Sequence, residues 1–110
     1  MKLTPIPKKL LSETVAIKVP VEDDYGTAWS DEAQELRCVR IERSEALLSK
    51  GYILSDGCKA VMYVDAVNST GLREFPTGSL VQVGDDWLNA RSVTAQGVGG
   101  VIHHWEVELA

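Results

Sequence analysis

Short runs of alternating apolar and polar residues recur along most of the chain, and turn formers separate them at intervals of about 8 to 12 residues. In the stretch ETVAIKVP, residues 13–20, the apolar β-branched side chains fall on one face of a strand and the residues between them on the other. The pattern predicts an all-β fold, a small antiparallel β-barrel or sandwich of about six strands. We expect a single domain spanning residues 1–110.

Five further features refine this prediction. The run at residues 58–67, CKAVMYVDAV, is apolar on both faces and is typical of a central strand. The runs SLVQV and WLNARSVTA flank a turn at residues 84–86 and predict a hairpin. The alternation in ELRCVRIER slips phase, which predicts a β-bulge near Cys38. We expect an exposed loop at residues 21–32 and a flexible, glycine-rich loop at residues 97–100.

The stretch SEALLSKGYILSDG, residues 44–57, is the least strand-like part of the chain. Ser44 and Glu45 could start a short helix, but Gly51 and Gly57 interrupt the run. We expect a long loop that has room for one helical turn. Loops of this length inside a small domain are usually functional or disordered.

Composition narrows the classes of function. The 11 basic and 16 acidic residues leave a formal charge of −5, which disfavours binding to a phosphate backbone. No segment approaches the roughly 20 apolar residues of a membrane helix, and the proline-interrupted start MKLTPIPKKLL lacks the apolar run of a signal peptide. We therefore expect no role at a membrane.

His103 and His104 are the two histidines of the chain, and they lie in the predicted last strand. Adjacent residues of a strand point to opposite faces, so the pair is poorly placed to share one metal ion, and the two cysteines are far away in sequence. The more economical interpretation makes His103 a packed, hydrogen-bonded core residue on the same face as a buried Trp105, and His104 a semi-exposed residue. We expect no metal site and no cofactor.

The sequence lacks the common catalytic motifs, so we expect no enzyme. The chain contains no GxSxG, P-loop or HExxH sequence, and its GVGG run precedes a strand instead of the helix of a dinucleotide site. Three tryptophans could form a stacking platform for single-stranded nucleic acid, but the acidic balance opposes that function.

Three stretches of the sequence indicate a protein family, which composition alone does not. The runs PIPKKLL near the start, YVDAVNS in the middle and HHWEVEL at the end resemble the minor capsid proteins of long-tailed bacteriophages and prophages. Within that group the chain is similar to the head-closure, or stopper, proteins of the head–tail connector. The DDYG run before Trp29 also fits the loop that follows the first strand of these proteins. The resemblance carries two sets of scaffold residues onto this chain: Asp65, Asn68 and Ser69 at a strand exit, and His103, His104, Trp105 and Glu106 in the final strand.

The resemblance implies a structural protein of the virion, located at the head–tail junction. Such a protein forms a ring of its own copies, contacts portal or adaptor proteins on one side and tail-terminator-like proteins on the other, and retains the packaged genome. Double-stranded DNA would pass through the ring without specific binding, and the acidic balance suits that passage. In isolation we expect a monomer or weakly associated protein.

The same resemblance suggests that residues 44–57 project into the channel and help to close it, through Leu47, Leu48, Lys50, Tyr52, Ile53 and Leu54. The alternative is a lid whose apolar side chains merely cover the core. Two other functions stay open: an adaptor or tail-side component of the same particle, and a small-barrel module that binds nucleic acid.

Overall fold

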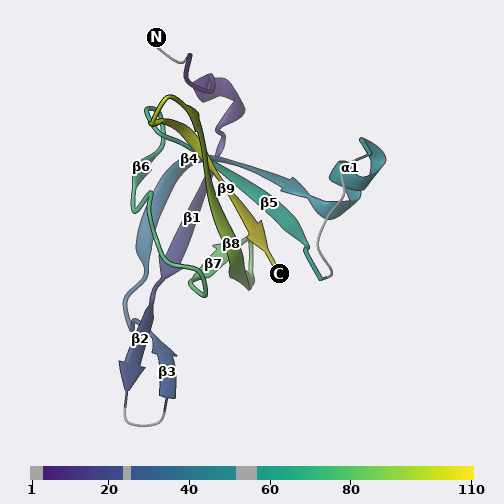
Figure 1. Cartoon of the computed structure of the whole chain (residues 1–110). Helices are drawn as coiled ribbons and strands as arrows, with labels where there is room; N and C mark the ends of the chain where they lie inside the picture. The colour runs from purple at the N-terminus through teal and green to yellow at the C-terminus, as the bar shows by residue number, and fades with distance from the viewer. Residues whose placement is uncertain (1–3, 24–25, 52–56) are drawn as a thin grey trace.

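A computed structural model describes residues 4–23, 26–51 and 57–110 of the chain. Six strands pair in the order β1-β7-β8-β9-β5-β4, and β4 pairs in turn with β1, so the antiparallel pairings close into a ring (Figure 1). The two-residue strand β6 adds to β4 outside this ring. The predicted all-β, antiparallel fold is confirmed. The ring strands and β6 are β1 (Glu13–Lys18), β4 (Gln34–Arg43), β5 (Ala60–Asp65), β6 (Thr70–Gly71), β7 (Leu80–Val83), β8 (Asp86–Val98) and β9 (Val101–Leu109).

The core fills the inside of the ring with the side chains that alternation assigned to one face. β5 lies between β4 and β9, and four of its six residues have no solvent exposure, as expected for a central strand. The predicted hairpin joins β7 to β8, where Gly84 adopts a positive φ of 64° at the turn. The fully buried hydrophobic side chains larger than alanine are Ile17, Leu36, Val39, Met62, Val64, Val81, Val107 and Leu109 in the strands, with Leu47 just outside them.

The bulge predicted in β4 lies at Cys38. The register of β4 against β1 shifts there, because Glu13 pairs with Val39 while the next residue pairs with Arg37. Cys38 has a φ of 61°, which is unusual for a residue with a side chain. The extra residue lets Leu36 and Val39 both point into the core although they are three positions apart.

Two expected loops are strands instead. β2 (Pro20–Asp23) and β3 (Gly26–Trp29) form a separate two-stranded hairpin that extends from the ring at the end opposite the N-terminus (Figure 1). The sequence predicted a loop here because turn formers surround two strands of only four residues each. The prediction of a flexible loop at residues 97–100 was also wrong, because β8 continues to Val98 and β9 starts at Val101. Gly99 and Gly100, with φ of 60° and 79°, close this hairpin in two residues.

Part of the long loop expected at residues 44–57 is a helix. α1 (Ser44–Ser49) follows β4 directly and projects sideways from the ring (Figure 1). Its start is tied to the residue just before β5, since the Ser44 backbone N–H donates to the carbonyl of Lys59 over 2.8 Å. No helix in the described part of the chain is long and apolar enough to cross a membrane.

Candidate functional site

An N-terminal arm lies across one end of the ring, and the polar scaffold residues gather around it. The arm comprises residues 4–11 and includes the short 3-10 helix η1 (Lys8–Leu10). Its main chain is held by side chains from β9 and from the turn after β5, which are 59 to 99 residues away in sequence. We call Asp65, Asn68 and His103 the clasp, because each of the three bonds directly to the arm.

Asp65 is the centre of the clasp. Its side chain has no solvent exposure and lies at the end of β5. One carboxylate oxygen accepts a hydrogen bond from the Ile6 backbone N–H of the arm over 2.9 Å. The other oxygen accepts the backbone N–H groups of Val67 and Asn68 over 2.9 and 2.7 Å. A single carboxylate thus forms the turn after β5 and fixes the arm to it.

Three donors on one carboxylate favour its charged form. Burial is the largest single influence and would raise the pKa of Asp65, but the backbone donors of Asn68, Ile6 and Val67 and the nearby His103 together outweigh it. The pKa of Asp65 therefore lies below its ordinary value. The carboxylate is an anion at neutral pH.

Asn68 and Ser69 complete the turn. The Asn68 side-chain amide donates to the carbonyl of Ile6 over 2.7 Å, so both backbone groups of that arm residue are bonded to the turn. The Ser69 hydroxyl is buried, accepts the Asp65 backbone N–H over 2.8 Å and donates to the carbonyl of Cys38. The carbonyl of Cys38, at the bulge of β4, thus fixes the turn to β4 through Ser69.

The two histidines touch each other and the arm. The Nδ1 atoms of His103 and His104 lie 2.7 Å apart, and Nε2 of His103 lies 2.6 Å from the carbonyl oxygen of Thr4. A carbonyl can only accept, so Nε2 of His103 carries the proton. In the neutral pair, Nδ1 of His103 is then the acceptor and Nδ1 of His104 the donor. This leaves Nε2 of His104 facing the Glu106 carboxylate at 3.5 Å.

We expected strand alternation to keep the side chains of the two histidines apart, and for their imidazole rings that prediction was wrong. Their rings meet edge to face, with centroids 5.0 Å apart, and their Nδ1 atoms are within hydrogen-bonding distance. Two imidazoles alone do not make a protein metal site, which needs three or four ligands. Across residues 4–23, 26–51 and 57–110, no group of three or more His, Cys, Asp or Glu side chains is placed to hold a metal ion.

The rest of the final strand follows the predicted alternation. Trp105 is buried at 8% exposure, as expected, and Val107 and Leu109 are buried on the same face. His103 is half-buried on that face and is not a core residue. Glu106 lies on the other face and accepts a hydrogen bond from the Gln96 side chain over 3.1 Å. Trp105 thus packs into the core, whereas the two histidines that precede it lie outside the core.

The tryptophans do not favour a base-stacking surface. Trp105 is enclosed in the core and cannot stack on a base. Trp29 on β3 is partly exposed, but its indole N–H donates to the carbonyl of Gly78 over 2.9 Å. Trp87 on β8 is covered on one face by the ammonium of Lys18, 5.3 Å from its ring centre.

The residues expected in a gating segment are divided by the structure. Leu47 is buried and anchors α1, whereas Leu48 is 60% exposed. Lys50 lies just after the helix and reaches the Glu42 carboxylate at 3.5 Å. Tyr52, Ile53 and Leu54 lie outside the described residues. The helix carries one apolar side chain that covers the core and one that does not.

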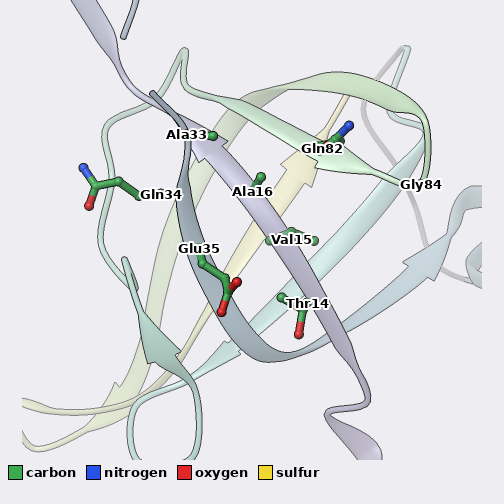
Figure 2. Close-up of a pocket in the computed structure, with 8 residues that line it drawn as sticks. All are labelled: Thr14, Val15, Ala16, Ala33, Gln34, Glu35, Gln82 and Gly84. Carbon is green, nitrogen blue, oxygen red and sulfur yellow. The ribbon is translucent and has the colours of Figure 1, made fainter. Parts of the chain in front are cut away.

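A surface hollow of about 400 Å³ opens beside β1 (Figure 2). Figure 2 shows residues of β1, of the start of β4 with Ala33 before it, and of β7 around it. Among the described residues that line the hollow, Glu35 is the one with an ionisable side chain. The hollow is lined by Thr14, Val15, Ala16, Ala33, Gln34, Glu35, Gln82 and Gly84.

Sequence reasoning selected the clasp residues only as scaffold and did not find their partners in the arm. Thr4 and Ile6 bond through their main chain, so their side-chain identities gave no signal. Pro5 and Pro7 on either side of Ile6 were the available clue, because alternate prolines favour the extended chain that the clasp holds.

Comparisons with known proteins bear on the whole domain. A family model described as "Minor capsid protein" matches residues 7–109, which include every strand of the ring. Searches of the curated proteins and of the solved structures returned no match.

Proposed function

This chain belongs to the minor capsid protein family and is a structural component of a phage particle, and from that membership we propose that it closes the head–tail connector as a stopper. In this role a ring of copies retains packaged DNA and offers a surface to the tail. The proposed neighbours are a portal or adaptor protein on the head side and a tail-terminator-like protein on the tail side. DNA passes through the ring without specific binding.

The observation that carries the proposal is the set of elements that project from a closed ring of strands. The β2–β3 hairpin and α1 leave the ring in different directions, and neither is needed to close it (Figure 1). A ring without sheet edges makes a stiff body, and projecting elements give it separate contacts with neighbours. The formal charge of −5 also suits a conduit that must release DNA.

Within this proposal, residues 44–57 contribute to closure. Leu47 serves as the anchor, and Leu48 and Lys50 are the described residues of the segment whose side chains are exposed, at 60% and 52%, with Lys50 also paired to Glu42. An exposed leucine on a helix held at one end is suited to contact between copies around a ring. The fully packed lid is the competing interpretation, and Leu48 is the side chain that it leaves unexplained.

A phage lacking this gene tests the proposal. We expect heads that fill with DNA and then lose it, together with free tails, because closure and tail attachment fail in one step. The measurement is DNase-sensitive DNA per filled head, with expression of the gene from a plasmid as the control. Sealed, DNA-filled heads without tails would instead indicate a tail-side component and would overturn closure.

The gating segment has its own test. Leu48→Asp, or removal of residues 50–55, should leave the fold intact and raise DNA leakage from assembled particles. Val98→Asp is the matched control, since Val98 is 56% exposed and lies at the tip of the β8–β9 hairpin. If particles with the shortened segment still seal their DNA, the gating role is wrong.

A further inference from the structure

The clasp recognises the arm through main-chain atoms. Its bonds go to the carbonyl of Thr4 and to the N–H and carbonyl of Ile6, and none goes to an arm side chain. From Thr4 to Leu10 no arm side chain is buried, and Leu11, at 3% exposure, is the first to enter the core. The arm is thus a peptide ligand bound to its own domain, with Leu11 as the fixed point.

We propose that in the assembled particle the arm of one copy occupies the clasp of a neighbouring copy. The contacts in the exchanged state are the same as those within one copy, so the exchange costs little bond energy. The two states differ in the local concentration of the clasp that the arm can reach. Within one copy, the short tether gives an effective concentration on the order of millimolar, which keeps the arm bound to its own clasp in dilute protein. In an assembled ring of copies, the clasp of the neighbouring copy is present at a comparable local concentration.

The arm is long enough to reach a clasp that lies close to the interface with a neighbouring copy. Thr4 lies seven residues before the fixed Leu11, so the extended arm reaches about 23 Å from that point, at about 3.3 Å per residue. This reach is close to the shortest dimension of the molecule, 25 Å, so a released arm can contact an adjacent copy packed along that direction. Pro5 and Pro7 reduce the conformational freedom that the released arm would otherwise gain, which lowers the entropic cost of binding again.

Charge complementarity supports binding of the arm to a second copy as well as to its own. The first 12 residues contain three lysines and no acidic residue, so the remaining 98 residues hold 8 basic and 16 acidic side chains and a formal charge of −8. A cationic arm is attracted by the acidic body of any copy. This inference rests on the proposed function only in requiring that copies meet in a ring.

Two full-length variants test the exchange in solution. One has a disabled arm, Ile6→Pro, which removes the N–H that Asp65 accepts. The other has a disabled clasp, Asn68→Ala with His103→Leu, and keeps its arm. The arm-disabled protein is labelled with nitrogen-15 and titrated with the unlabelled clasp-disabled protein to about 1 mM, the tether concentration. The readout is the side-chain amide signal of Asn68, which bonds the arm directly.

We expect this signal to move toward its position in the unmodified protein, because the intact arm of one variant fills the intact clasp of the other. Addition of unlabelled arm-disabled protein is the control and should move it far less. If the two additions have the same effect, exchange is excluded. The null-phage experiment can fail independently of this one, so the two outcomes separate closure from exchange.

A second measurement covers the case in which a variant does not fold. Chains that carry a photo-crosslinker at Thr4 are made in nitrogen-14 and nitrogen-15 forms, mixed, and assembled into particles. Exchange should join the arm of one isotope form to the clasp peptide of the other as often as to its own form. Crosslinks confined to one isotope form would overturn the inference.

Discussion

Replacing Asp65 with asparagine removes the charge of the clasp while keeping its shape. The carboxylate accepts three backbone N–H groups, two on one oxygen and one on the other. Asparagine has one acceptor oxygen and one amide nitrogen. We expect the oxygen to keep the two donors of the turn, which leaves the amide nitrogen facing the Ile6 N–H, donor against donor.

The cost follows from this count. A hydrogen bond to a charged group contributes about 1.5–3 kcal/mol and a neutral one about 1 kcal/mol, so one lost bond and two weakened bonds amount to about 2.5–7 kcal/mol. This is a large fraction of the roughly 5–15 kcal/mol that stabilises a domain. The melting temperature should fall by about 10–30 °C. Amide exchange at Ile6 should also become fast, because the arm loses its central bond.

The pH dependence gives the sign of the effect. The pKa of Asp65 is lower in the folded protein than in the unfolded chain, so its contribution is complete above about pH 5 and is lost as the pH falls through the folded pKa. Asparagine does not titrate. The difference in unfolding free energy between the two proteins should therefore be largest at neutral pH and shrink on acidification below about pH 4.

Urea denaturation of both proteins at pH 7 and at pH 3 measures these differences. Asp31→Asn is the matched control, since Asp31 is exposed, and it should change stability by less than about 0.5 kcal/mol. An Asp65→Asn protein as stable as the unmodified one at pH 7 would refute the count of bonds. An equal loss at both pH values would refute the role of the charge.

Three further outcomes are expected. Trp105→Ala should cost about 3–5 kcal/mol because it empties a buried site, whereas His104→Ala should cost little, and a chelator should leave both denaturation midpoints unchanged; a midpoint that moved with chelator would restore the metal hypothesis. Gly97→Ala should destabilise the β8–β9 hairpin by about 2 kcal/mol or more, because its Cβ would lie 1.9 Å from the carbonyl oxygen of Val101; thermal melts beside Gly99→Asn, which has open space around it, would show whether that contact matters. Light scattering of the purified protein at micromolar concentration should give a mass near the 12.0 kDa of one chain, and a stable ring under these conditions would contradict assembly that depends on neighbours.

The sequence determined the parts of the fold that depend on neighbours along the chain. Alternation located the core faces of β1 and β9, because a side chain on a strand points in or out according to its position alone, and the continuous apolar run identified β5 as a central strand. The phase slip at Cys38 located the bulge for the same reason. The β2–β3 hairpin was missed because strands of four residues are too short to show a period among turn formers.

Tertiary structure decided which of these elements meet. The ring closes because β1 pairs with both β4 and β7, and no local pattern specifies partners so distant in sequence. The clasp is the clearest case. Asp65 and His103 were recognisable as residues of interest, but the groups they bind are main-chain atoms 59 and 99 residues away. A backbone N–H or carbonyl is the same in every residue, so only the folded chain could show which ones these side chains hold.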